Sequence, residues 1–93
     1  MDISIPQNGW KIFTKQNCNY CKKTKLLVPE AEYVVCDQYL QMDRSLFLEK
    51  MDLLTGTQHR TFPMVFHDGS FVGGHAETVV YLDKQNAFAD VDF

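Results

Sequence analysis

The run Cys18-Asn19-Tyr20-Cys21 contains the residues of this sequence best suited to chemistry, two cysteines separated by two residues. The attacking species in thiol–disulfide exchange is the thiolate, which is scarce at neutral pH unless the pKa of the thiol is lowered. The N-terminus of a helix lowers that pKa, because its free backbone N–H groups and its dipole favour an anion. We therefore predict that Cys18, at a helix start, is the nucleophile and that Cys21, one turn further on, is the resolving thiol.

Nearby lysines favour the same thiolate. Lys22 and Lys25 share a helical face with Cys18, at i+4 and i+7, and Lys15 lies three residues upstream of it. Although the net charge is −3, five of the nine basic residues lie between positions 11 and 25 with no acid among them: Lys11, Lys15, Lys22, Lys23 and Lys25. This pattern indicates a local site for a small anion, whereas the overall charge disfavours a nucleic-acid partner.

A Cys-x-x-Cys pair can also be half of a zinc site or an inert pair of core cysteines. The other half of a zinc site is missing, because His59, His67 and His75 recur every eight residues and Cys36 stands alone. The helix start and the lysines disfavour the inert pair. We predict no metal site, and we interpret Cys36, at the end of an apolar strand, as a buried small hydrophobic residue whose part in the exchange stays open.

Length and composition predict a single globular domain over residues 1–93, with 45% hydrophobic and 23% charged residues. No apolar run approaches the ~20 residues that cross a bilayer. The first residues have neither the basic start nor the apolar stretch of a signal peptide. We expect a cytoplasmic monomer with no membrane partner, and in that reducing compartment a Cys-x-x-Cys indicates redox or metal chemistry.

Hydrophobic patterning and turn residues predict seven elements that must position the cysteines. Asn17 is a suitable N-cap for the first helix and Pro29 ends it, Gly56 ends the second helix, and Asp68-Gly69 is a hairpin turn. The predicted strands are 10–14, 32–36, 63–66 and 70–72, and the predicted helices run from Asn17 or Cys18 to about 28, from about 43 to 55 and from about 76 to 84. This order predicts an α/β protein with the thioredoxin fold, a four-stranded mixed sheet flanked on both faces by three or more helices.

Three separated motifs over residues 10–84 resemble the glutaredoxin family. The family patterns K-x-x-C-P-Y-C, R-T-V-P and G-G-x-[ST]-D are similar, in that order, to Lys15-Gln16-Asn17-Cys18-Asn19-Tyr20-Cys21, Arg60-Thr61-Phe62-Pro63 and Gly73-Gly74-His75-Ala76-Glu77. Each motif alone is weak, but all three in this order on matching elements identify the chain as similar to a dithiol glutaredoxin.

The resemblance implies a glutathione site. In the family the proline that matches Pro63 is cis and lies beside the active-site cysteine, and the backbone of the preceding residue, here Phe62, pairs with the cysteinyl part of glutathione. The backbone N–H groups after the double glycine hold the γ-glutamyl carboxylate. The implied glutathione-binding residues are Lys15, Tyr20, Arg60, Thr61, Phe62, Pro63, Gly74, His75, Ala76 and Glu77.

The resemblance implies that Lys15 contacts the glycine carboxylate of glutathione and that Tyr20 flanks its sulfur, and in some members the residue that matches Arg60 lies near the same carboxylate. Each residue also has a structural alternative: Pro63 can simply begin a strand, the glycine pair can be only a tight turn, and Lys15 and Arg60 can be solvated surface charges. The three motifs together favour the functional interpretation over these alternatives.

Two positions depart from the family pattern. Asn19 replaces the proline of C-P-Y-C and adds a backbone N–H at the helix start. Ala76 and Glu77 replace the Ser or Thr and the Asp of the third motif, so the side-chain contacts of those residues to the γ-glutamyl group are in doubt. We predict that glutathione binds, but more weakly than in a typical member.

The implied function is that of a glutathione-dependent disulfide oxidoreductase with a redox-active disulfide and a role in electron transport. It reduces protein disulfides and glutathione mixed disulfides, with glutathione as the reducing substrate and disulfide-containing or glutathionylated proteins as partners. One alternative is a binding role, since some members hold a [2Fe–2S] cluster between two subunits through the first cysteine and glutathione. The absence of the family proline at Asn19 leaves that alternative open.

Residues 86–93 form a candidate C-terminal tail, Asn86-Ala87-Phe88-Ala89-Asp90-Val91-Asp92-Phe93. The tail resembles the extreme C-terminus of eukaryotic-type ribonucleotide reductase small subunits, which docks on the large subunit. A thioredoxin-like electron donor that docks on the large subunit of ribonucleotide reductase through this tail is therefore a second alternative. The structural alternative is that Phe88 and Val91 pack on the core at the end of the last helix.

Overall fold

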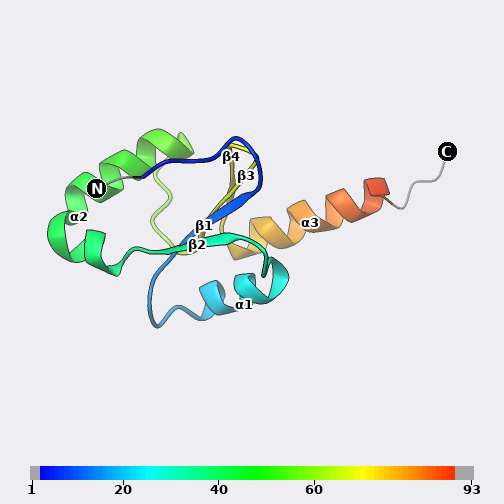
Figure 1. Ribbon diagram of the computed structural model, residues 1–93, viewed down its shortest axis with the longest axis horizontal. Coiled ribbons are helices and arrows are strands. Elements are labelled where there is room, and N and C mark those ends of the chain that lie inside the picture. The colour runs from blue at the N-terminus through cyan, green and yellow to red at the C-terminus, as the bar shows by residue number, and fades with distance from the viewer. Residues whose placement is uncertain (1–2, 90–93) are drawn as a thin grey trace.

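A computed structural model describes residues 3–89 of the chain. Four strands and three helices follow one another in the predicted β-α-β-α-β-β-α order (Figure 1). Their bounds are β1 (Trp10–Thr14), α1 (Asn19–Leu27), β2 (Glu32–Val35), α2 (Asp37–Thr55), β3 (Met64–His67), β4 (Ser70–Gly73) and α3 (His75–Ala89).

The four strands form one mixed sheet in the order β2-β1-β3-β4. Strand β1 runs parallel to β2 and antiparallel to β3, and β3 and β4 form a hairpin. Asp68 and Gly69 make the predicted turn, with φ angles of 50° and 84° that match a two-residue hairpin loop. The sheet and its helices confirm the predicted thioredoxin fold.

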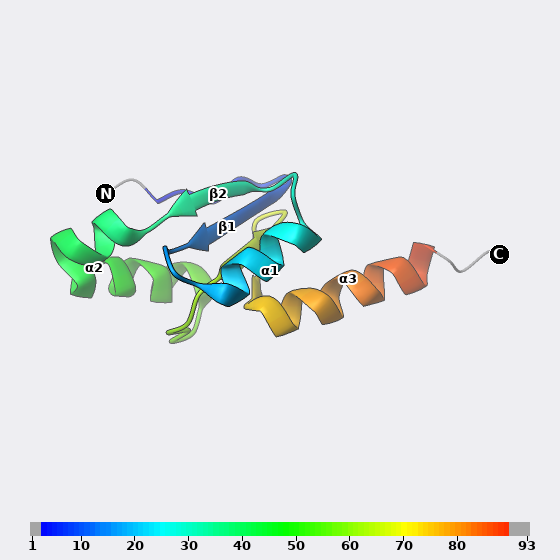
Figure 2. The same cartoon turned by 90° about the horizontal axis from the view of Figure 1, so that it is seen from below.

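Alternating side chains divide the core into two clusters, one on each face of the sheet. Phe13 and Phe66 pack with Phe47 and Met51 of α2 on one face. On the other face Ile12 and Val65 pack with Val28 just after α1, and Leu82 of α3 packs against this cluster. Helix α2 therefore covers one face while α1 and α3 cover the other (Figure 1), and Figure 2 shows α1 and α3 next to each other.

Helix α3 is anchored to the sheet by an aromatic cluster. The rings of Trp10 and His67 stack with centroids 4.1 Å apart, and Tyr81 of α3 meets Trp10 edge-on at 5.7 Å. A hydrogen bond of 2.7 Å joins the Tyr81 hydroxyl to Nδ1 of His67. These contacts fix the helix whose first turn carries the predicted γ-glutamyl site.

The predicted start of the second helix was six residues too late. Helix α2 begins at Asp37 and is kinked at Asp43, where φ is −158° and ψ is 86°. Oδ1 of Asp43 accepts a hydrogen bond of 3.0 Å from the N–H of Leu46, so Asp43 caps the second helical part. Asp43 is therefore a capping residue, as its type suggests, but it lies at a kink inside α2 and not at the start of the helix. The predicted stop is confirmed, since Gly56 adopts a left-handed conformation with φ of 74°.

Helix α3 extends five residues beyond its predicted end, because residues 85–89 contain no glycine or proline to stop it. The backbone of the first four residues of the candidate tail, 86–89, is therefore helical. Residues 90–93 lie outside the described part of the chain, so docking of the tail on ribonucleotide reductase stays a prediction. Within residues 3–89, no helix is both long and apolar enough to cross a membrane.

Gly73 is constrained by both its backbone and its neighbours. Its φ is +130°, and an added Cβ would lie 2.7 Å from Cβ and Cγ of Glu77. We predict that Gly73→Ala lowers the free energy of unfolding by about 3 kcal/mol, because strain and overlap add. Gly56→Ala is the matched control, since φ there is +74° with nothing within 4 Å, and it should cost about 1 kcal/mol. Urea unfolding measures both, and equal losses would contradict the packing of Glu77 on Gly73.

Candidate active site

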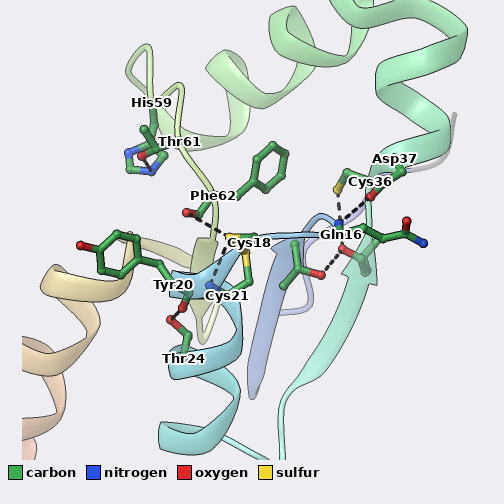
Figure 3. Close-up of a disulfide and its surroundings, with 12 residues drawn as sticks. Gln16, Cys18, Tyr20, Cys21, Thr24, Cys36, Asp37, His59, Thr61 and Phe62 are labelled. Carbon is green, nitrogen blue, oxygen red and sulfur yellow. Dashed lines mark hydrogen bonds between the residues drawn. A yellow bond between two sulfur atoms is a disulfide. The ribbon is translucent and has the colours of Figure 1, made fainter.

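Cys18 and Cys21 form a disulfide at the start of α1, with Cα atoms 5.2 Å apart. Cys18 is the N-cap of the helix, and the N–H of Cys21 donates a hydrogen bond of 3.2 Å to its sulfur (Figure 3). The prediction that Asn17 caps the helix is wrong, because Asn17 has a left-handed backbone with φ of 57° and the next residue takes the cap position. The predicted nucleophile is thus itself the capping residue, and its sulfur accepts from an N–H group that the helix does not use.

The segment just before β3 contacts Cys18. The carbonyl oxygen of Phe62 lies 3.7 Å from Sγ of Cys18 (Figure 3). A disulfide sulfur carries no proton, so this contact becomes a hydrogen bond only when Cys18 is a thiol. The Phe62–Pro63 peptide bond is cis, which is the form implied by the glutaredoxin resemblance. Antiparallel pairing of β1 with β3 brings this segment to the start of α1.

The loop between β1 and α1 is held by a carboxylate that sequence reasoning missed. Oδ1 of Asp37 accepts a hydrogen bond of 3.0 Å from the N–H of Gln16 (Figure 3). The parallel register pairs Thr14 with Val35, so two residues further on Gln16 and Asp37 lie beside each other. The contact follows from the register of β1 and β2, which the sequence alone does not give. Within the loop, Nζ of Lys15 lies 5.9 Å from the centroid of the Phe62 ring.

Seven of the ten predicted glutathione-binding residues line one cavity of about 290 Å³. The ring of Tyr20, which is 58% exposed, lies 5.5 Å from the ring of His75 between centroids, so α1 and α3 meet across this space. We call this space the helix-end cavity, and its lining residues are Tyr20, Thr61, Phe62, Gly74, His75, Ala76 and Glu77. Pro63 is buried next to it, with its carbonyl oxygen close to Gly74.

Glu77 caps the helix on which it lies. Its Oε1 accepts a hydrogen bond of 2.8 Å from the N–H of Gly74, and the hydroxyl of Thr78 donates 2.8 Å to the Gly74 carbonyl. The Glu77 carboxylate therefore already accepts a hydrogen bond from one of the N–H groups at the positive end of α3. The N–H groups of His75, Ala76 and Glu77 remain at the first turn, where a helix makes no internal bonds to them.

Arg60 does not join the other predicted residues. Its guanidinium makes two hydrogen bonds to the carboxylate of Asp52 in α2, at 2.5 and 2.9 Å, and it lines neither cavity beside the disulfide. These hydrogen bonds lower the pKa of the Asp52 carboxyl. A carboxylate of glutathione would therefore compete with Asp52 for this guanidinium.

A second cavity of about 410 Å³ lies on the β2 side of β1 and shares no lining residue with the first. Both cysteines of the disulfide line it, together with the three lysines expected to favour the Cys18 thiolate. We call it the lysine cavity, and its lining residues are Thr14, Lys15, Gln16, Asn17, Cys18, Cys21, Lys22, Lys25, Tyr33 and Val35. Sequence reasoning missed this site as a cavity, because β2 supplies one wall from across the sheet.

Among the described residues, no group of three or more histidine, cysteine, aspartate or glutamate side chains is close enough together to hold a metal ion. The two sulfurs at the start of α1 lie beside lysine side chains and the N–H groups of the helix start.

Cys36 has the opposite environment to Cys18. Its side chain is fully buried between β2 and α2, in the cluster that contains Phe47. Burial, and to a lesser extent the charge of Asp37, raises the pKa of the Cys36 thiol to about 12. A thiol with that pKa stays protonated at neutral pH, so it is neither a nucleophile nor a strong ligand.

The pKa of Cys36 gives a pH-dependent prediction. In a Cys18→Ser/Cys21→Ser variant, Cys36 should not react with iodoacetamide up to pH 10, because the folded state keeps its proton. In the unfolded chain the thiol ionises near its ordinary pKa of about 8.5, so urea should restore labelling at pH 9. Mass spectrometry counts the label, and fast labelling of the folded variant at pH 9 would contradict burial of Cys36.

Known glutaredoxins are similar to this chain in sequence. The Glutaredoxin family model matches residues 11–72. Glutaredoxin-2, mitochondrial, of Rattus norvegicus is 34% identical over 77 residues, which are 81% of this chain and 48% of that protein. The chain thus spans about half the length of the curated relatives that it matches.

Solved structures agree as well. Glutaredoxin 1 from Francisella tularensis, complexed with cacodylate, is 28% identical with a TM-score of 0.72, covering 85% of this chain and 96% of that one. The buckwheat glutaredoxin–glutathione complex is 25% identical with a TM-score of 0.64, covering 84% of this chain and 71% of that one. The family model covers more than half of the chain, and the fold and the paired cysteines agree with it: the chain belongs to the glutaredoxin family.

Proposed function

We propose that this chain is a thiol–disulfide oxidoreductase that reduces protein disulfides and glutathione mixed disulfides, with glutathione as the reductant. The observation that carries the proposal is the placement of Cys18. Its sulfur lies at the N-cap of α1, in a disulfide with Cys21, between two surface cavities. Membership of the glutaredoxin family supports the same chemistry.

The first half of the reaction transfers electrons from the protein to its substrate. With the pair reduced, the Cys18 thiolate attacks one sulfur of a target disulfide, forms a mixed disulfide and releases the other target sulfur as a thiolate. The Cys21 thiolate then attacks Sγ of Cys18, which frees the second target thiol and forms the Cys18–Cys21 disulfide. The N–H of Cys21, 3.2 Å from the Cys18 sulfur, favours the negative charge on that sulfur whenever it is an anion.

The second half restores the dithiol with two molecules of glutathione. The thiolate of the first attacks Sγ of Cys18, forms a glutathione mixed disulfide there and releases Cys21 as a thiol. The second attacks the glutathione sulfur of that mixed disulfide, which yields oxidised glutathione and the Cys18 thiolate. One target disulfide and two glutathione thiols thus become two target thiols and one glutathione disulfide, so electrons and protons balance.

The helix-end cavity is our proposed site for glutathione. The Phe62 backbone lies beside the Cys18 sulfur, where the cysteinyl part of the tripeptide would pair with it. The free N–H groups at the start of α3, at the other end of the cavity, suit the γ-glutamyl carboxylate. The buckwheat relative was solved as a complex with glutathione, which supports the assignment of the ligand.

Two features of this chain weaken the proposed glutathione site. The Glu77 carboxylate lies at the helix end that would receive the γ-glutamyl carboxylate, so two negative charges would lie close together. Ala76 has no hydroxyl to donate to the ligand. The proposed site therefore relies on backbone groups, and binding should be weaker than in a member that carries Ser or Thr at this position.

Exchange of the cysteines tests the mechanism directly. Cys18→Ser should reduce glutathione-coupled activity by about 1,000-fold or more, because no thiolate remains to attack. Cys21→Ser should keep deglutathionylation of a mixed disulfide, which needs only Cys18, and lose most of its activity on protein disulfides. Cys36→Ser is the matched control, and its activity on both substrates should equal that of the unmodified protein. Activity retained in Cys18→Ser, or electrons accepted from a thioredoxin reductase but not from glutathione, would contradict the proposal.

Ala76→Ser tests the glutathione site. A hydroxyl in the first turn of α3 offers one more hydrogen bond to the γ-glutamyl carboxylate, so KM for glutathione should fall by about 3- to 10-fold. Val80→Ser is the control, because Val80 lies one turn further along α3, is half exposed and lines neither cavity. Steady-state kinetics with varied glutathione gives both values, and an unchanged KM in Ala76→Ser would contradict the assignment.

A further inference from the structure

Of the residues that line the lysine cavity, only Lys15 is among those implied to bind glutathione, so most of this cavity lies outside the proposed glutathione site. The disulfide lines the lysine cavity, and the helix-end cavity comes close to it at Phe62, whose carbonyl oxygen lies 3.7 Å from Sγ of Cys18; the two cavities are built from different parts of the fold. The helix-end cavity uses the segment before β3 and the start of α3, whereas the lysine cavity uses β1, β2 and α1. A substrate that exchanges with Cys18 while glutathione has its own site therefore has a second surface available beside the same sulfur.

The charged side chains that line the lysine cavity are all lysines, and the Asp37 carboxylate contacts the lining, where it accepts a hydrogen bond from the N–H of Gln16. Lys15, Lys22 and Lys25 line it, and no aspartate or glutamate is among its lining residues. Lys25 is held over the ring of Tyr33, with Nζ 5.6 Å from the ring centroid. Within residues 3–89 none of these three ammonium groups forms an ion pair, whereas Lys11, close by on β1, pairs with Glu32 at 3.1 Å.

The remaining lining residues do not neutralise this charge. The Tyr33 hydroxyl donates a hydrogen bond to the carbonyl of Val28, and the Thr14 hydroxyl donates one of 3.3 Å to the carbonyl of Val34. Val35, which is 56% exposed, adds an apolar surface at the β2 wall. The cavity thus combines unpaired cations with an apolar wall and lies directly against both sulfurs, which suits carboxylate side chains on a peptide segment.

We propose that the lysine cavity binds acidic side chains that flank the disulfide of a protein substrate, so that the enzyme prefers acidic disulfide segments. This inference rests on the proposed function, because it assigns the site of the protein substrate in that same reaction. The two surfaces then have separate roles: the helix-end cavity holds glutathione and the lysine cavity selects the protein that is reduced.

The size of the preference follows from the exposure of the lysines. One solvent-exposed ion pair contributes about a 1.5- to 5-fold change in an equilibrium constant, so three acting together give roughly tenfold. Such a preference is screened by salt, because the Debye length falls from about 10 Å at 0.1 M to about 3 Å at 1 M ionic strength.

Two synthetic peptides that differ only in charge test the proposal. Each carries one intramolecular disulfide, flanked by glutamates in the first peptide and by glutamines in the second. With glutathione as the reductant, kcat/KM should be about tenfold higher for the glutamate peptide at low salt, and the ratio should fall towards one in 1 M NaCl. A ratio near one at low salt would overturn the proposal.

Charge variants separate docking from activation of the thiolate. Lys22→Gln/Lys25→Gln should bring the ratio of kcat/KM for the two peptides close to one, because any effect of these lysines on the Cys18 thiolate lowers both rates by the same factor and leaves the ratio unchanged. The matched control is Lys50→Gln/Lys84→Gln, which removes the same charge at residues that line neither cavity and should keep the preference. If the lysines act only on the Cys18 thiolate, both peptides lose activity equally, which would overturn the docking role.

The two peptides also distinguish loss of the docking role from loss of the proposed function. Reduction of the glutamine peptide with glutathione, without any preference for the glutamate peptide, would leave the oxidoreductase in place and remove the docking role. Failure to reduce either peptide with glutathione would contradict the proposed function, and the docking role with it.

Discussion

The hydrogen bond from the N–H of Cys21 to the sulfur of Cys18 is the interaction on which the site depends. It exists because Cys18 takes the cap position of α1, where a polar side-chain atom is needed to satisfy an N–H group that the helix leaves free. A sulfur atom that caps a helix is favoured as an anion, and an anionic sulfur is the reactive form of cysteine. The same hydrogen bond thus caps the helix and favours the thiolate of Cys18.

The sheet brings everything else to this cap. Strand β1 ends just before the loop that leads to Cys18, and it is the central strand to which β2 and β3 both pair. The parallel neighbour β2 ends at Val35, two residues before Asp37, whose carboxylate holds the loop through Gln16. The antiparallel neighbour begins just after Phe62, whose carbonyl reaches the Cys18 sulfur. The two cavities lie on these two sides of β1, so one mixed sheet provides two separate surfaces for a single sulfur.

Much of this arrangement follows from local sequence signals. Strand β1 and the Asp68-Gly69 hairpin were predicted because alternation and turn residues act over a few positions. The start of α2 was mistaken because Asp43 is a good capping residue that here caps an internal kink. Asn17 was mistaken for a cap because residue type alone does not reveal that its backbone turns left-handed. Local signals therefore locate elements better than they locate boundaries.

Pairings between distant residues were harder to predict. The resemblance to glutaredoxins named seven residues that the structure places around one cavity. It did not predict that Arg60 pairs with Asp52 or that Glu77 caps its own helix. Both pairings depend on side chains specific to this chain rather than on the family pattern. The lysine cavity could not be predicted from the sequence for a related reason. Its wall includes Tyr33 and Val35 of β2, and only the register of the sheet places that strand beside the Cys18 loop.

The central claim is that the Cys18 thiolate exchanges disulfides with glutathione. The most direct measurement is to incubate reduced Cys21→Ser with oxidised glutathione at neutral pH and to map the adduct by peptide mass spectrometry. Without a resolving thiol, the mixed disulfide should accumulate at one glutathione per chain, on the peptide that contains Cys18. An adduct on Cys36, or no adduct at all, would contradict the account.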